Sequence, residues 1–147
     1  MFGNIKEAEK YVRKKFSELG KKVELRINET PDGKLVVDFK FPHIVDECVG
    51  WCRKSLDASE ADCREMCEFE VISSFVVASD GTVEDSDIAY PFTRTERCIF
   101  AEDKTRCEVE APWAPLRSTH FHMNSVHKHL KCPTVDDLFD YIAACLG

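Results

Sequence analysis

The sequence predicts an α+β domain in which helices and β-hairpins occupy separate segments of the chain. Apolar residues recur at helical spacing near both termini, and two further segments alternate apolar with polar residues on either side of short turns. Hairpins of this kind favour an antiparallel or mixed sheet over a doubly wound parallel one. The length of 147 residues fits one domain, 1–147, with an N-terminal portion at 1–43 and a second portion at 44–147.

The first portion is expected to be a helix followed by a hairpin. Asn4 and Glu7 resemble a capping box, and apolar residues then follow helical spacing as far as Gly20. Residues 22–41 alternate apolar and polar side chains around the turn sequence TPDG at 30–33. This pattern predicts a β-hairpin.

The second portion begins with a predicted helical hairpin at 44–68. Its break at 57–59 is followed by a pattern typical of a helix start, in which Ser59 precedes Asp62 by three residues. The other expected elements are a strand at 69–79, a hairpin formed by 95–101 and 104–110, a short strand at 118–123, and a helix at 134–146 capped by Thr134.

The charge of the chain is uneven. The net charge is −7, yet residues 1–22 carry seven Lys or Arg against three Glu, a net of +4, which leaves −11 for the rest. An acidic body argues against nucleic acid as a partner, because it would repel the phosphate backbone. The basic first helix fits either an acidic protein or peptide partner or a solvated face. No apolar run nears the ~20 residues of a membrane span, and the start has no apolar signal region, so we expect a cytoplasmic protein.

Four of the eight cysteines form a twin C-x-x-x-C pattern at 48, 52, 63 and 67. Residues i and i+4 share one face of a helix. In an antiparallel helical hairpin, Cys48 would therefore face Cys67, and Cys52 would face Cys63. We expect two disulfides at these positions, with a four-thiolate metal site or free thiols as alternatives.

The other four cysteines allow one further expectation. If 95–110 is a hairpin with a two-residue loop, Cys98 lies opposite Cys107 at a closely spaced position that suits a disulfide. Cys132 and Cys145 remain unassigned. Disulfides without a secretion signal are typical of intracellular proteins of hyperthermophiles, which suggests a thermophilic archaeon or its virus as the source.

Histidines are concentrated in HFHMNSVHKH at 120–129. In a strand, His120 and His122 point to the same side and could both bind a metal through neutral imidazole. His127 and His129 repeat this spacing, as alternative ligands or as a solvated loop. Asp137 follows in the first turn of the last predicted helix, where it serves either helix capping or a metal. Two histidines and one carboxylate would leave one zinc position open for water.

These residues resemble the motif of JAMM (MPN-plus) zinc metalloproteases. The matching segments are ECVG at 47–50, HFH at 120–122 and PTVDDL at 133–138. The resemblance implies a JAMM-like portion within 44–147, zinc bound by His120, His122 and Asp137, Glu47 as general base, and Thr134 in place of an oxyanion-stabilising serine. The implied activity is hydrolysis of an amide or isopeptide bond, in an active or a divergent, inactive form.

Two other functions fit the same residues. A non-enzymatic interaction protein stabilised by disulfides would use the cysteines and needs no metal. A rolling-circle nuclease would use the His-hydrophobic-His motif of HFH together with a tyrosine nucleophile, for which Tyr141 is the downstream candidate.

Overall fold

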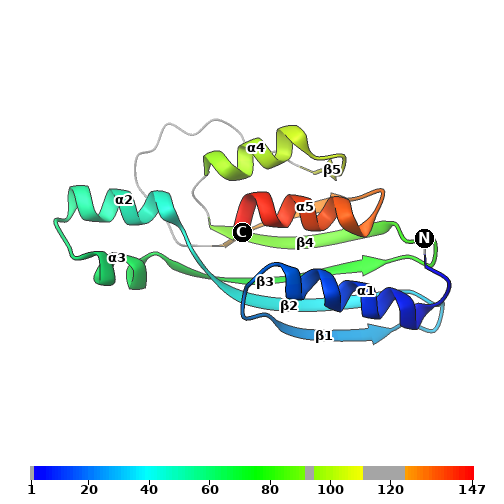
Figure 1. Ribbon diagram of the computed structural model, residues 1–147. Coiled ribbons are helices and arrows are strands. Elements are labelled where there is room, and N and C mark those ends of the chain that lie inside the picture. Colours follow the sequence, from blue (N-terminus) through cyan, green and yellow to red (C-terminus); the bar gives the residue numbers. More distant parts are fainter. Residues whose placement is uncertain (1, 92–94, 111–124) are drawn as a thin grey trace.

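The computed structural model describes residues 2–91, 95–110 and 125–147 (Figure 1). Within these ranges the chain forms five helices and six strands. In chain order they are α1 (Ile5–Glu18), β1 (Glu24–Glu29), β2 (Leu35–Ile44), α2 (Asp46–Ser55), α3 (Glu60–Met66), β3 (Glu68–Val77), β4 (Val83–Pro91), α4 (Glu96–Lys104), β5 (Glu108–Val109), β6 (Ser125–Lys131) and α5 (Val135–Leu146).

The strands form one sheet in the order β1-β2-β3-β4-β6-β5, and every neighbouring pair is antiparallel. The predicted α+β class is therefore confirmed, with an antiparallel rather than a mixed sheet. The helices α1 and α5 lie against one face of this sheet, with α4 beside α5 (Figure 1). No described segment packs on the opposite face.

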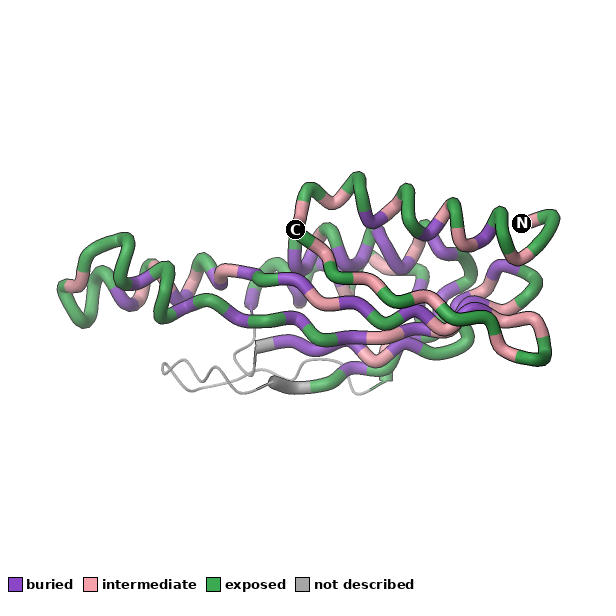
Figure 2. Tube along the Cα trace, turned by 90° about the horizontal axis from the view of Figure 1, so that it is seen from below, coloured by how far each residue is buried: buried purple, intermediate pink, exposed green. Residues whose placement is uncertain are grey.

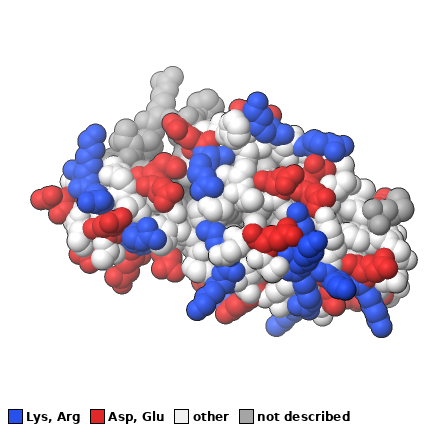
Figure 3. All heavy atoms as spheres, viewed as in Figure 1, with Lys and Arg blue, Asp and Glu red and all other residues white. Residues whose placement is uncertain are grey.

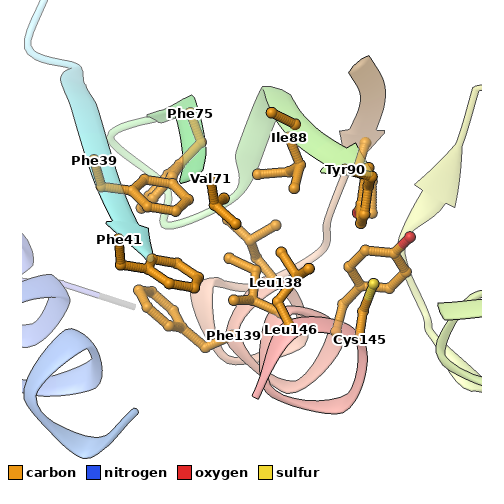
Figure 4. Packing of buried hydrophobic residues seen from close by; sticks show 14 of the residues in the cluster. Phe39, Phe41, Val71, Phe75, Ile88, Tyr90, Leu138, Phe139, Cys145 and Leu146 are labelled. Atoms are coloured by element: carbon orange, nitrogen blue, oxygen red, sulfur yellow. The ribbon is translucent and has the colours of Figure 1, made fainter. Parts of the chain in front are cut away.

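The core lies between the sheet and these helices. Along β2 and β3, alternate side chains are buried and the intervening ones are exposed or half-buried, as Figure 2 shows. The ring of Phe16 in α1 lies 4.9 Å from that of Phe39 in β2 and 4.8 Å from that of Phe139 in α5. Figure 4 shows apolar side chains of β2, β3 and β4 pointing toward α5. Burial of these side chains is the main stabilising contribution to such a two-layer fold.

The predicted N-terminal helix and first hairpin are both present. Asn4 caps α1 by accepting a hydrogen bond from the Glu7 amide at 2.9 Å. Between β1 and β2, the Thr30 amide donates to the Lys34 carbonyl, and Gly33 adopts a φ of 81°. Glycine is favoured there because other residues rarely adopt a positive φ.

The helical hairpin is present as α2 and α3, and we call residues 46–66 the arm. Ser59 caps α3 by accepting from the Asp62 amide, as the sequence pattern predicted. The disulfides Cys48–Cys67 and Cys52–Cys63 are both present, each with Cα atoms 5.7 Å apart, so these two predictions are confirmed. The arm extends beyond the end of the sheet (Figures 1 and 2).

The predicted hairpin at 95–110 is wrong. Thr95 accepts a hydrogen bond from the Cys98 amide and starts helix α4, which runs to Lys104. The predicted Cys98–Cys107 disulfide is wrong for the same reason, because the helix removes the cross-strand register on which it depended. Instead, the structure has the disulfides Cys98–Cys145 and Cys107–Cys132, which leaves no free cysteine.

Of the remaining elements, one was predicted from the sequence and another was not. Helix α5 follows Thr134 as predicted. Strand β4, at 83–91, was not predicted from the sequence. The strand expected at 118–123 lies outside the described residues. None of the helices in the described ranges is long and apolar enough to span a membrane.

Candidate functional site

Only part of the predicted zinc site falls within the described residues, because His120 and His122 lie outside them. At the start of α5, the Thr134 hydroxyl accepts from the Asp137 amide at 3.1 Å and donates to the Asp137 Oδ2 atom at 2.8 Å. The Arg106 guanidinium lies 4.0 Å from the same carboxylate oxygen. These contacts give Thr134 and Asp137 a helix-capping role. Among the described residues, no group of three or more possible ligands is placed to hold a metal.

The predicted general base Glu47 lies in the first turn of α2. Burial, followed by the negative charges of Asp46 and Glu96, raises the pKa of Glu47. Its Oε2 atom is buried and has no hydrogen-bond partner among the described residues. A general base must lie within hydrogen-bond reach of the reacting group. Figure 1 shows α2 beyond the end of α5 that carries the C-terminus, whereas Asp137 lies at the other end of α5.

The structure therefore does not bring Glu47 to Asp137. Helix α5 has 12 residues, which corresponds to a length of about 18 Å. Zinc-bound water would have to contact Glu47 while the zinc contacts Asp137, and ligand bonds are only about 2 Å long. The zinc-hydrolase hypothesis remains a prediction, since two of its ligands lie outside the described residues.

The nuclease hypothesis depended on Tyr141, which is a core residue. Its side chain is 2% exposed and packs against Tyr90, with ring centroids 6.2 Å apart. The Tyr141 hydroxyl donates to Glu102 Oε1 at 3.4 Å, and burial raises the pKa of Tyr141 well above its ordinary value. A nucleophile needs access to its substrate and a lowered or base-assisted pKa. Neither condition is met at Tyr141.

The alternative ligands His127 and His129 lie on the sheet face opposite the helices. The His127 Nδ1 atom lies 2.7 Å from Asp87 Oδ1, and the His129 Nδ1 atom lies 3.5 Å from Asp85 Oδ1. Each histidine of β6 is thus paired with one aspartate of β4. We call this side of the sheet the open face, and it carries the strongest candidate site.

Polar side chains line up across the open face. Because the strands pair in register, residues on neighbouring strands stand side by side and their side chains contact one another. One row crosses five strands through Arg26, Asp38, Ser74, Asp87 and His129. The row is polar from end to end, in contrast to the apolar rows on the face that meets the helices.

A groove of 610 Å³ lies along the open face. Its lining includes Arg26, Asp38, Lys40, Ile72, Ser74, Asp87 and His127. At one end, Lys40 lies 3.0 Å from Glu24 and 3.6 Å from Glu70, and the hydrogen bond with Glu24 raises the pKa of Lys40. At the other end, Asp87 holds His127.

Between these paired ends, the groove offers polar groups that are not used within the fold. Arg26 and Asp38 stand opposite each other in β1 and β2, yet neither has an ion-pair partner among the described residues. Beside them, the Ile72 side chain is 58% exposed in the middle of β3. A guanidinium, a carboxylate and an exposed aliphatic side chain therefore lie together where no described element covers them.

Sequence reasoning did not identify these residues as a site. Alternation had placed the even-numbered residues of 35–41 on the polar side of a hairpin, which is correct for Asp38 and Lys40. Their grouping with Ser74 and Asp87 depends on the order and register of three strands, for which the sequence carries no local signal.

Comparisons of the chain with protein-family models, with curated protein sequences and with solved structures give no match.

Proposed function

We propose that this protein is a non-enzymatic binding module, stabilised by disulfides, that takes an extended segment of a partner protein in the groove of its open face. The observation that carries the proposal is the groove itself, in which Arg26 and Asp38, without an ion-pair partner in the described part of the chain, lie beside the exposed Ile72. The volume of 610 Å³ falls within the range of about 300–1,000 Å³ typical of ligand sites.

The groove chemistry suits a peptide of mixed polarity. Arg26 can donate to carboxylate or carbonyl oxygens, and Asp38 can accept from amides or a lysine. Full burial of an isoleucine stabilises a complex by about 1.5–3 kcal/mol, so Ile72 supplies an apolar anchor among polar contacts. The surrounding carboxylates of Asp85, Asp87 and Glu70 disfavour a nucleic-acid strand, whose phosphates they would repel.

The covalent framework supports binding rather than catalysis. All eight cysteines are in disulfides, so none is available as a thiolate nucleophile. In the groove, His127 is held by Asp87, and no hydrogen bond among the described residues joins it to a hydroxyl group. The strands that carry the groove are paired in antiparallel register, which lowers the ordering cost of binding because the contact groups are already in place.

The test is a selection of random 12-residue peptides displayed on phage against the oxidised protein. Selected peptides are synthesised with a fluorophore, and their dissociation constants are measured by fluorescence anisotropy. We expect Ile72→Lys and Arg26→Glu each to weaken binding at least tenfold, a loss of about 1.4 kcal/mol.

The matched control is Phe100→Lys, which changes a similarly exposed apolar residue on α4, away from the groove (59% exposed). It should leave the affinity unchanged. Peptides that bind the Ile72→Lys and Arg26→Glu variants as tightly as the unmodified protein would refute the proposal, as would failure to select any peptide.

A further inference from the structure

Helix α1 carries a stripe of lysines on the side away from the core. Ala8, Val12 and Phe16 are its buried residues and face the sheet. Lys6, Lys10 and Lys14 follow one another at intervals of four and are exposed. Residues four apart are neighbours on a helix surface, so these three ammonium groups form one line, which we call the lysine stripe.

The lysine stripe forms no close ion pair in the described part of the chain, and the one acidic residue on which it has a resolved effect is Asp136, whose pKa the charge of Lys14 helps to lower. Lys6, Lys10 and Lys14 have no ion-pair partner among the described residues, whereas Lys15, on the flank of the helix, lies 3.5 Å from both Glu18 and Asp136. The other two acidic residues of α1 also contact groups outside the stripe, because Glu7 accepts a hydrogen bond from the Gly3 amide and Glu9 lies 3.9 Å from Arg13. Figure 3 shows Lys and Arg side chains gathered over α1, at the lower right of that view.

The like charges of the stripe destabilise helix α1. Like charges at i and i+4 destabilise a helix, and the stripe contains two such pairs in succession. Glu18 stands at the next interval of four and ends the stripe with an opposite charge, and its carboxylate lies 3.5 Å from Lys15. An unpaired line of one sign on a surface attracts a partner of the other sign and speeds its association.

We propose that the lysine stripe docks an acidic helical segment of a partner protein. Four residues of helix correspond to a rise of about 6 Å, so carboxylates at i, i+4 and i+8 of a partner helix match the stripe. The stripe runs from Lys6 to Lys14, a rise of about 12 Å along the helix axis. A short acidic segment can pair with it without approaching the rest of the chain, which carries a net −11.

The same charge balance argues against a longer polyanion. Nucleic acid or an anionic membrane would extend past α1 and meet the acidic body of the protein. Lysine also forms single-point contacts rather than the bidentate contacts to phosphate that arginine provides. The stripe lies on the helix side of the sheet, away from the groove of the open face, so this inference is independent of the proposed peptide binding.

The probe is a fluorescent 18-residue Ala-based helical peptide with Glu at i, i+4 and i+8. Its partner control contains the same residues with Glu placed on different faces. Anisotropy titrations at 50 mM and 150 mM NaCl measure binding. We expect the striped peptide to bind at least fivefold more tightly than the scrambled one, with weaker binding at the higher salt concentration.

The decisive variant is Lys6→Gln/Lys10→Gln/Lys14→Gln, which removes the stripe with little risk to the fold because all three residues are exposed. It should reduce binding at least tenfold. The matched control Arg53→Gln/Lys54→Gln/Lys104→Gln makes the same change in net charge at exposed sites outside the stripe, and it should reduce binding less than threefold.

Three outcomes would overturn the inference. The two triple variants could weaken binding equally, which would indicate a general charge effect. The striped peptide could fail to bind at 50 mM NaCl. A 20-base-pair DNA duplex or vesicles containing 30% phosphatidylserine could bind through the stripe more tightly than the peptide does, which would assign the surface to another class of partner.

Discussion

The sulfur atoms of Cys98 and Cys145 are bonded to each other, which links α4 to α5 across 47 positions of the chain. Next to this bond, the Arg97 guanidinium donates to the Gly147 carbonyl at 2.8 Å and to the Ala143 carbonyl at 3.4 Å. A cation at the C-terminal end of a helix interacts favourably with its dipole. The end of α5 is therefore held by a covalent bond and by a charged cap, both from α4.

Removal of this disulfide should lower the global stability of the fold. The double variant Cys98→Ala/Cys145→Ala opens a loop of 47 positions, for which chain entropy gives a loss of about 4 kcal/mol. Urea unfolding followed by circular dichroism, without reductant, measures the change. A loss below 1 kcal/mol would mean that the packing of α5 alone holds the two helices together.

The arm should respond differently to the loss of its disulfides. The only fully buried residues of α2 are Cys48 and Cys52, and that of α3 is Cys63, so the sulfur bridges take the place of an apolar core. In Cys52→Ala/Cys63→Ala, we expect local opening of the arm. Amide hydrogen exchange should become at least tenfold faster in 46–66 and stay unchanged in β2 and β3. Equal acceleration in the strands would show that the arm and the sheet unfold as one unit.

The sequence predicted the arm because its geometry is local. Cys48 and Cys52 are one helical turn apart, as are Cys63 and Cys67, so any antiparallel pairing of two such helices brings the same cysteines together. The predicted Cys98–Cys107 disulfide was wrong because its hairpin was wrong: Ile99 and Phe100 fit a strand as well as a helix. The N-cap hydrogen bond of Thr95 and the packing of α4 on α5 decide the outcome.

The open face was beyond sequence reasoning for a related reason. In β4, Asp85 and Asp87 alternate with buried residues, and polar residues of this kind are depleted in strands. Their positions become informative only when β4 is placed between β3 and β6. The difficulty at the start of α5 is different. The Thr-x-x-Asp spacing is visible in the sequence, but it fits a helix cap and a metal motif equally well.

The aromatic cluster should dominate the stability of the two-layer core. Phe139 is buried and packs on Phe16 at 4.8 Å and on Phe75 at 6.0 Å between ring centroids. Phe139→Ala should lower the free energy of unfolding by about 3–5 kcal/mol because it leaves a cavity. Phe100→Ala removes an exposed ring and should change it by less than about 0.5 kcal/mol. Thermal unfolding of both variants measures the contrast, and similar losses would contradict the assigned core.

Stability should fall with acidification because of His43. Burial, followed by the positive charges of Lys21 and Arg97, lowers the pKa of His43 to about 4. The unfolded chain has its histidine pKa near 6.5 and so takes up a proton that the folded chain does not. Stability is therefore lost as the pH falls from about 6.5 to 4, by about 2–3 kcal/mol at pH 4.5.

Urea unfolding at pH 7 and pH 4.5 tests this assignment with the variant His43→Gln. Glutamine does not titrate, so the variant should lose less stability between the two pH values than the unmodified protein does. The pH dependence of stability that remains in the variant comes from the other titratable groups. Equal losses in the two proteins would show that His43 is protonated in the folded state as readily as in the unfolded one.

Glu47 should act in the opposite sense. Burial raises the pKa of its carboxyl group, so its contribution to stability is full at low pH and is lost as the pH rises through the folded-state pKa. Its buried Oε2 atom has no hydrogen-bond partner within the described ranges. Glu47→Gln should therefore raise the free energy of unfolding by about 1 kcal/mol at pH 7, with a smaller gain at pH 4.5.

The exposed residue Glu65 of the same arm provides the control, because Glu65→Gln should leave the stability unchanged at both pH values. The zinc-hydrolase hypothesis makes a different demand on Glu47, since a general base cannot be replaced by an amide. Under that hypothesis the variant loses peptide hydrolysis. A variant that is more stable at pH 7 and binds groove peptides as before identifies Glu47 as a buried charge that the fold tolerates. A less stable variant would contradict the assignment, because the Glu47 carboxyl group would then have to make favourable contacts in the folded state.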